Sequence, residues 1–235
     1  MIPITRRVRD APMTKVKSEL AGNSLPSRMF YRFGRTVTWG FCRVYNRLTI
    51  TGRENLPLSG GYIIAPVHRS IIDTMACAGI TKRRIRYMGK DSMWETQPGN
   101  WLLSALGAFP VSRGTADREA LQRCIAVVEG GEPLVLYPEG ERKSGPIVQP
   151  MFDGAAYVAI KAGVPIIPIG IGGSEHVMSK GSWFVHPKKM RLIIGAPLMP
   201  PEGLNRKAPR GVVKDLTSRL HEEVQILFDR AQAQV

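Results

Sequence analysis

From Gly52 onward the sequence alternates short apolar runs with longer amphipathic stretches, and this alternation constrains the fold more than any other feature. The apolar runs have the length of strands, and between them apolar residues recur at the three- and four-residue steps of a helix. The predicted strands are Tyr62–Val67, Arg84–Met88, Pro133–Tyr137, Pro165–Ile171 and Met190–Gly195, with Leu48–Thr51 as a sixth. The predicted helices are Ile72–Ala78, Asn100–Leu106, Arg118–Val128, Gly154–Ala162 and Val212–Ala231. This order favours an α/β fold with a central, largely parallel or mixed β-sheet flanked by helices.

Two segments precede the alternating region. Residues 1–27 are polar, contain three prolines, and are predicted to form a flexible arm. Residues 28–48 are predicted to form an amphipathic helix within a single domain that covers residues 28–235. The apolar side of this helix is formed by Phe30, Phe33, Val37, Phe41, Val44 and Leu48, and arginines occupy another side. The apolar side either packs on the domain's own core or lies on an anionic membrane surface.

The net charge and the number of cysteines limit the expected classes of binding partner and the expected cellular compartment. The formal net charge of +14 indicates anionic partners, which include lipid phosphates, nucleic acid and an acidic carrier protein. Three scattered cysteines build neither a disulfide framework nor a CxxC metal site, so a reducing compartment is expected. The first thirty residues lack a signal-peptide core, and no apolar run reaches eighteen residues. We therefore expect a peripheral protein at the cytoplasmic face of the cell membrane.

Two ionisable residues follow the strand predicted at residues 62–67. His68 comes directly after it, and Asp73 lies five positions later inside a second apolar run. On one continuous helix, residues five apart point about 140° away from each other and cannot meet. They can meet if His68 lies in the turn and Asp73 in the first helical turn. The alternative is a capping box, in which Ser70 begins the helix and Asp73 only reaches back to a backbone N–H.

Further charged residues follow another short apolar run and another predicted strand. Arg113 comes after the apolar run of "GAFPVSR", and "LVLYPEGERKSG" ends a strand before Glu139 and Arg142. Taken singly, Arg113 fits a surface salt bridge and "PEG" fits ordinary turn chemistry. Ligands gather at the carboxyl ends of parallel strands, so these groups and the His–Asp pair are expected to converge. Guanidinium groups bind phosphate, and a histidine held by a carboxylate can take a proton from a hydroxyl.

Four motifs in this order carry a family resemblance. They are H-x4-D at 68–73, "GAFPVSR" at 107–113, aromatic-P-E-G-x-R at 137–142, and "VPIIPI" at 164–169. With these motifs the chain resembles the glycerolipid acyltransferase family, specifically the PlsC-type 1-acyl-glycerol-3-phosphate acyltransferases, from about Gly52 to Pro197. Any one motif is weak, whereas four in order at fitting intervals are highly specific.

The resemblance implies transfer of a fatty acyl group from a thioester, acyl-CoA or acyl carrier protein, to the hydroxyl of a lysophosphatidate. It makes His68 the general base and Asp73 the residue that orients it. We expect backbone N–H groups at the helix start, together with Lys90, to stabilise the oxyanion. It assigns acceptor binding to Lys90, Gly107, Arg113, Glu139, Gly140 and Arg142. Glycerol 3-phosphate and other lysophospholipids are alternative acceptors. We expect neither metal nor cofactor, because a thioester is already activated.

Three residues depart from the family's usual pattern. Val67 replaces an asparagine before the histidine, Glu141 a small hydroxyl residue in the third motif, and Asp153 a lysine before Gly154. Two of these substitutions add negative charge near the expected phosphate site. They bear on the identity of the acceptor more than on the class of reaction.

Two other function classes compete with acyl transfer. The charge alone fits a nucleic-acid-binding protein, but only 7% of residues are aromatic and no stacking or helix-turn-helix signature is present. A hydrolase could use the same histidine and aspartate, or a serine or cysteine nucleophile, yet the chain has no G-x-S-x-G elbow. We therefore expect no nucleic-acid partner, and we favour acyl transfer.

Overall fold

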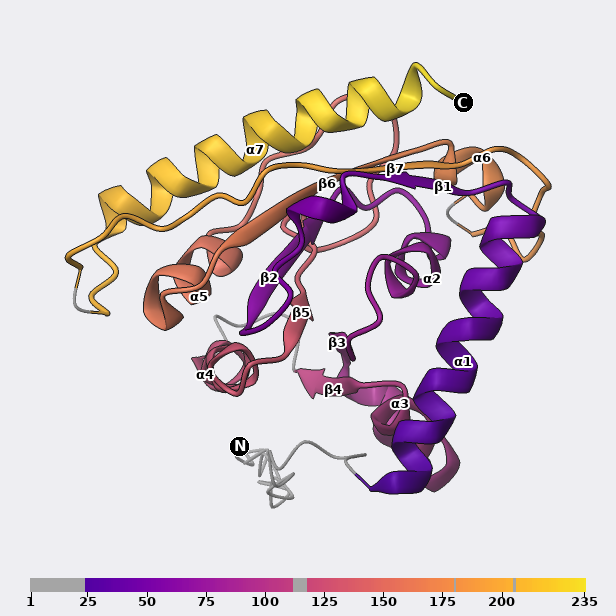
Figure 1. Ribbon diagram of the computed structural model, residues 1–235, viewed down its shortest axis with the longest axis horizontal. Helices are drawn as coiled ribbons and strands as arrows, with labels where there is room; N and C mark the ends of the chain where they lie inside the picture. Colours follow the sequence, from indigo (N-terminus) through magenta and orange to yellow (C-terminus); the bar gives the residue numbers. More distant parts are fainter. Residues whose placement is uncertain (1–23, 112–117, 180, 205) are drawn as a thin grey trace, which may run out of the picture.

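A seven-stranded sheet lies between layers of helices in the computed structural model, which describes residues 24–111, 118–179, 181–204 and 206–235 (Figure 1). Its strands are β1 (Thr49–Thr51), β2 (Tyr62–Pro66), β3 (Arg86–Lys90), β4 (Ala108–Val111), β5 (Pro133–Val135), β6 (Ile166–Gly172) and β7 (Arg191–Ile194). Its helices are α1 (Leu25–Val44), α2 (Ile72–Ala78), α3 (Gln97–Ala105), α4 (Arg118–Glu129), α5 (Gly154–Ala162), α6 (Ser174–Val177) and α7 (Arg210–Gln232), with 3₁₀ turns η1 (Arg53–Asn55) and η2 (Asp91–Trp94). The predicted α/β fold is confirmed.

The strands follow the order β1-β7-β6-β2-β5-β3-β4, and all neighbours are parallel except β6 and β7. The predicted mixed, largely parallel sheet is therefore confirmed. The sequence pattern did not predict β4 as a strand, because its four residues include Pro110 and lack the length of the other apolar runs. Since β2, β5, β3 and β4 are neighbours and parallel, their carboxyl ends share one edge of the sheet.

The core lies around the two central strands β2 and β6, in which every residue is buried. Helix α7 packs directly on β6, and glycines permit this close approach. A Cβ added at Gly170 would lie 2.2 Å from the carbonyl carbon of Leu227, and one at Gly172 would lie 2.3 Å from the Ala231 oxygen. Such packing is available only to glycine, so α7 is held against the sheet that carries the site.

Helix α1 begins earlier and ends earlier than the predicted 28–48. Ser24 caps its start by accepting a hydrogen bond from Ser27 N, and Pro26 fits the first turn. After Val44 the chain turns through Arg47, whose φ is +48°, and Leu48 is buried before β1. Of the arm predicted at 1–27, residues 1–23 lie outside the described residues, and Leu25 onward is helical.

Most of the predicted apolar side of α1 faces away from the protein. Phe33 is 67% exposed and Val44 79%, with Val37 and Phe41 also exposed. The opposite face packs through Tyr31, whose hydroxyl accepts a hydrogen bond from Ile85 N at 2.9 Å. Within the described residues, this apolar surface therefore has no cover from the domain's own core. Among the helices described, none is both long and apolar enough to cross a membrane.

Candidate active site

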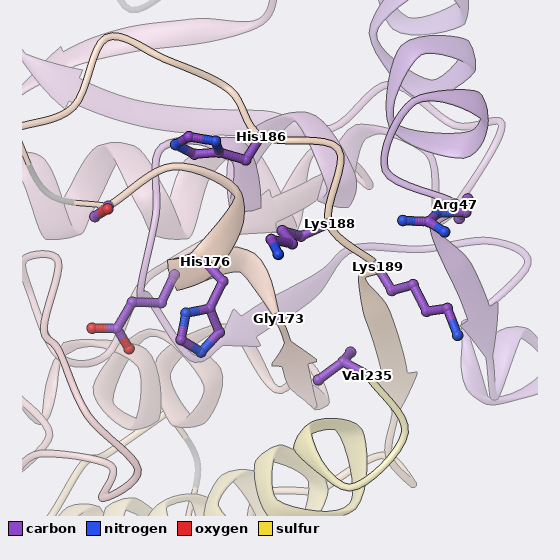
Figure 2. A pocket seen from close by; sticks show the side chains of 9 residues that line it. Arg47, Gly173, His176, His186, Lys188, Lys189 and Val235 are labelled. Atoms are coloured by element: carbon purple, nitrogen blue, oxygen red, sulfur yellow. The ribbon is translucent and has the colours of Figure 1, made fainter.

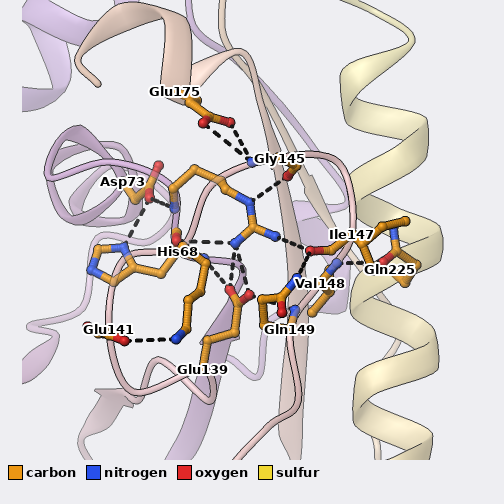
Figure 3. A network of polar contacts seen from close by, with 12 residues as sticks. His68, Asp73, Glu139, Glu141, Gly145, Ile147, Val148, Gln149, Glu175 and Gln225 are labelled. Carbon is orange, nitrogen blue, oxygen red and sulfur yellow. Dashed lines mark hydrogen bonds and ion pairs between the residues drawn. The ribbon is translucent and has the colours of Figure 1, made fainter. Parts of the chain in front are cut away.

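The imidazole of His68 contacts the carboxylate of Asp73 in the turn between β2 and α2 (Figure 3). The distance from Nδ1 to Oδ2 is 3.1 Å, and Asp73 is fully buried. The same Oδ2 accepts hydrogen bonds from Arg69 N at 2.8 Å and Ser70 N at 2.7 Å. These backbone bonds fix the carboxylate, so the position of the imidazole partner is set by the turn itself.

One half of the predicted capping box coexists with this contact. Asp73 reaches back to Ser70 N, but the Ser70 hydroxyl donates to Met178 O at 2.6 Å. Asp73 Oδ2 therefore contacts the His68 imidazole and also accepts the hydrogen bond from Ser70 N that a capping box would have. The N–H groups at residues 69, 70, 72, 73 and 74 already have acceptors within the turn. These five N–H groups are therefore occupied, and the expected role of the helix start in binding an oxyanion stays a prediction.

The His68 ring is also fixed from its face. It stacks on Tyr137 with ring centroids 3.8 Å apart and an angle of 20° between the planes. The Tyr137 hydroxyl lies 2.9 Å from Thr74 Oγ1, and burial raises the pKa of this phenol well above its ordinary value. The tyrosine therefore stays neutral and held in place. One imidazole nitrogen faces Asp73 and the other points away from it (Figure 3).

A buried ion pair holds the segment that carries His68. Arg69 Nη1 lies 2.9 Å from both carboxylate oxygens of Glu139, and both side chains are buried. Glu139 also accepts hydrogen bonds from His68 N at 3.0 Å and Gln149 N at 2.9 Å. Arg69 donates further to the carbonyls of Gly145 and Ile147. The network thus joins the end of β2 to the loop after β5.

This network corrects the expected role of Glu139. Its carboxylate is 1% exposed and both of its oxygens are bonded within the protein, so direct contact with an acceptor is not supported. Arg69 was missed by the sequence analysis, although a cation directly after a buried strand needs a buried partner. The third motif supplies such a partner, Glu139, directly after another predicted strand.

Most of the other residues predicted to bind the acceptor lie near the carboxyl ends of the parallel strands, at the same edge of the sheet as His68. Gly140, which has φ +75°, and the partly exposed Arg142 lie in the loop after β5, beside the His68 turn. Lys143 N donates to His68 O at 2.9 Å, which ties this loop to the turn. Lys90 ends β3 at the same edge of the sheet, and Arg113 lies outside the described residues.

Gly107 does not lie at this edge. It precedes β4, so it is at the amino end of the strand whose carboxyl end points toward the site. Its φ is +87°, and an added Cβ would lie 2.6 Å from Ile85 O. The glycine therefore serves the turn into β4, and its place in the phosphate site stays a prediction that this position does not favour.

The two acidic departures have partners of their own. Glu141 contacts Lys143 Nζ at 2.8 Å, and Asp153 accepts a hydrogen bond from Thr217 Oγ1 on α7 at 2.9 Å. Val67, the third departure, is fully buried. These contacts offset part of the negative charge that the sequence brings near the site.

Other nucleophiles near the turn are not activated. Cys77 lies one helical turn after Asp73, and burial, followed by the nearby Asp73 carboxylate, raises the pKa of its thiol well above the ordinary value. A thiolate is therefore disfavoured there. In the part of the chain that the structure describes, no group of three or more His, Cys, Asp or Glu residues is arranged to hold a metal ion.

Comparison with known proteins shows the family to which the chain belongs. The family model described as Acyltransferase matches residues 47–172, which is more than half of the chain and includes the His68–Asp73 turn and the loop after β5. The protein belongs to the Acyltransferase family.

Individual relatives narrow the likeness further. The chain is 31% identical over 160 residues to the 1-acyl-sn-glycerol-3-phosphate acyltransferase of Bacillus subtilis, which covers 68% of this chain and 74% of that protein. It is 27% identical over 177 residues to a chloroplastic 1-acyl-sn-glycerol-3-phosphate acyltransferase of Brassica napus, covering 73% of this chain and 51% of that one. The fold matches the crystal structure of the 1-acyl-sn-glycerophosphate acyltransferase PlsC from Thermotoga maritima, with a TM-score of 0.67, 24% identity, and 86% and 79% of the two chains covered.

Proposed function

We propose that the protein transfers a fatty acyl group from an acyl thioester to the free hydroxyl of 1-acyl-glycerol 3-phosphate, giving phosphatidic acid. The observation that carries this proposal is the His68–Asp73 contact at the sheet edge, within a chain whose relatives have this named activity. Acyl-CoA and acyl carrier protein are the two donor classes, and the basic surface of the chain favours an acidic carrier as well as CoA.

In the proposed mechanism His68 is the general base. His68 Nδ1–H donates a hydrogen bond to Asp73, which leaves the lone pair of the second ring nitrogen, Nε2, available. Nε2 takes the proton of the acceptor hydroxyl as its oxygen attacks the thioester carbonyl. The tetrahedral intermediate expels the thiolate, which receives the proton from the imidazolium. Asp73 stabilises that imidazolium, and Tyr137 keeps the ring from turning.

The acceptor phosphate would be held on the same edge of the sheet. Arg142 comes from the loop that is bonded to the His68 turn, Arg113 follows β4 in the chain, and Lys90 is the last residue of the neighbouring strand β3. Guanidinium groups fit phosphate oxygens in pairs of hydrogen bonds. Such binding positions the hydroxyl, so loss of a phosphate contact would lower the rate as well as the affinity. No metal or cofactor is required by this reaction.

Docking at a membrane would be provided by α1. Its exposed apolar residues can enter the headgroup layer while Arg28, Arg32 and Arg43 meet lipid phosphates. The negative surface potential of a cytoplasmic leaflet favours this arrangement. The protein would then act peripherally, where its lysophospholipid acceptor resides.

The test is thiol release from palmitoyl-CoA, with and without lysophosphatidate, followed by mass spectrometry of the lipid products. Release is expected only with acceptor present, and His68→Ala should lower it by about a hundredfold or more. His221→Ala is the matched control, because His221 lies on α7 and its ring nitrogen is 3.0 Å from Val148 O, away from the His68 turn. Release at full rate without acceptor would show a hydrolase instead. Glycerol 3-phosphate and other lysophospholipids, offered in competition, would reveal a different acceptor.

A further inference from the structure

A loop that the acyl-transfer site does not use carries two strongly exposed aromatic residues. Trp183 is 94% exposed and Phe184 78%, in the segment that joins α6 to β7. This segment is nonetheless ordered by hydrogen bonds: Ser182 Oγ accepts one from Phe184 N at 3.1 Å, and His186 N donates to Val177 O at 2.8 Å. Two adjacent aromatic side chains that are exposed to solvent form an apolar patch, and such patches are typical of binding surfaces.

The loop is tied to the carboxyl end of α1. The Tyr45 hydroxyl donates to Val185 O at 3.1 Å, Asn46 Nδ2 to His186 O at 2.9 Å, and Arg47 Nη2 to Pro187 O at 2.7 Å. These three bonds place the aromatic pair beside the end of the helix where Val44 is exposed. The apolar surface of α1 and that of the loop are therefore held together.

A basic pocket adjoins the same loop, because His186, Lys188 and Lys189 are part of its lining (Figure 2). It has a volume of about 850 Å³, and its lining includes the cationic side chains of Arg47, Lys188 and Lys189 and the imidazoles of His176 and His186. In Figure 2 Lys188 points between the two histidines, and Lys189 lies on the side of Arg47. The acidic side chain in the lining, Glu175, accepts hydrogen bonds from Gly145 N at 3.2 and 3.4 Å. The pocket thus has the chemistry of an anion site.

The backbone at Arg47 supports a role for this arrangement. Its φ of +48° lies in the left-handed region that residues with a side chain rarely adopt. The conformation turns the chain from α1 into β1, and Arg47 remains at the pocket. Backbone strain of this kind is often found at binding sites, where surrounding contacts hold it.

We infer that residues 181–189 form a second membrane-docking element, in which Trp183 and Phe184 enter the headgroup layer and the basic pocket receives the phosphate of an anionic phospholipid. The inference rests on the proposed docking through α1 and extends it from one element to two. Aromatic side chains favour the bilayer interface, and lysines near its surface are attracted by anionic lipid. The chosen occupant is a bilayer because the apolar patch and the cationic pocket are adjacent, and both are tied to α1.

The pocket also adjoins the catalytic turn. Glu175 is bonded to Gly145, whose carbonyl accepts from Arg69, and Met178 O accepts from the Ser70 hydroxyl. The α6 segment is thus shared by the pocket wall and the His68–Asp73 turn. Docking through this loop would therefore fix the orientation of the catalytic edge relative to the membrane.

The test measures binding of the full chain to vesicles of phosphatidylcholine, with and without phosphatidylglycerol, by cosedimentation. Trp183→Ser/Phe184→Ser should weaken binding to both kinds of vesicle by about tenfold. Lys188→Ala/Lys189→Ala should weaken binding by about tenfold only where phosphatidylglycerol is present, and high salt should abolish this difference. Leu58→Ser is the apolar control, because Leu58 is 96% exposed in the η1–β2 loop, and Lys207→Ala/Lys214→Ala is the charge control. The unfolding midpoint of each variant reports whether it is folded.

A double substitution on α1, Phe33→Ser/Val37→Ser, distinguishes membrane docking through α1 from docking through the loop. If Phe33→Ser/Val37→Ser on α1 weakens binding and the loop variants bind like the unchanged protein, the inference is overturned while docking through α1 stands. If the loop variants weaken binding and the α1 variant does not, the inference holds and α1 docking fails. Unchanged binding in all of them overturns both.

Two further readouts address the lipid itself. Brominated phospholipid should quench the fluorescence of the unchanged protein more than that of Trp183→Phe, which keeps an aromatic ring but removes the reporter; equal quenching contradicts insertion of this residue. Inorganic phosphate should compete with phosphatidylglycerol vesicles better than chloride does at the same ionic strength, and Lys188→Ala/Lys189→Ala should remove this difference. Equal competition by the two anions would show that the pocket does not recognise phosphate and would overturn its assignment to the lipid phosphate.

Discussion

Replacing Glu139 with glutamine separates a structural role of this carboxylate from a role in binding the acceptor. The change keeps the shape of the side chain but removes its charge and one acceptor oxygen. Arg69 would then remain buried with carbonyl partners alone, and the new amide would compete for the space beside its guanidinium. The His68 backbone N–H would also lose part of its anchor. We therefore expect loss of stability and loss of activity together.

The magnitude follows from the burial of both partners. Removing one member of a buried ion pair costs about 3–5 kcal/mol, because the other charge is left without compensation. For a chain of this length, 1 kcal/mol corresponds to a shift of roughly 2–4 °C in the unfolding midpoint. Glu139→Gln should thus lower the midpoint by about 10 °C. Arg69→Met combined with Glu139→Gln should recover part of this loss, because the unpaired charge is gone.

The assay is equilibrium unfolding by urea, together with steady-state kinetics in which the acceptor concentration is varied. Glu129→Gln is a suitable control, because its ion pair with Arg206 is at the surface and should be worth less than about 1 kcal/mol. The reasoning is refuted if Glu139→Gln unfolds like the unchanged protein but has a raised KM for the acceptor. That result would mean that Glu139 leaves its buried pair and binds the substrate.

Three other changes test separate parts of the structure. Asp73→Asn should lower kcat by about a hundredfold or more with little change in KM, because the amide no longer fixes the His68 tautomer; steady-state kinetics with a normal kcat would contradict this. Burial raises the pKa of the Cys42 thiol from 9.0 to about 11. The unfolded chain therefore loses this proton first, and stability should fall by about 2–3 kcal/mol as the pH rises from about 9 to about 11. The free energy of unfolding of Cys42→Ala, measured with denaturant, should not show this fall between about pH 9 and about pH 11. The same fall in Cys42→Ala would contradict the raised pKa of the Cys42 thiol. Gly107→Ala and Gly131→Ala both place alanine at positive φ, at a cost of about 1–2 kcal/mol, but only the Cβ at Gly107 meets a backbone oxygen. Gly107→Ala should therefore be clearly less stable in urea, and equal losses would refute the contact with Ile85.

Local patterns were sufficient for the regular elements. The bounds of α2 and α5 agree with the predicted 72–78 and 154–162, because apolar periodicity and flanking glycines are properties of neighbouring residues. The strand–turn–helix position of His68 and Asp73 was also predictable, since a separation of five residues across a helix start permits contact. The boundaries of α1 were less predictable, because they depend on Ser24 and on the turn at Arg47.

The sequence by itself determined the α/β class, the approximate elements and the His–Asp pair, because these follow from periodicity and short-range geometry. Only the tertiary structure decided that Glu139 is buried against Arg69, that Gly107 lies at the far end of β4, and that the apolar side of α1 is exposed. Each of these depends on which strands are neighbours and which faces are covered. Pairing across 70 residues is set by the packing of the whole sheet, and no short stretch of sequence contains that information.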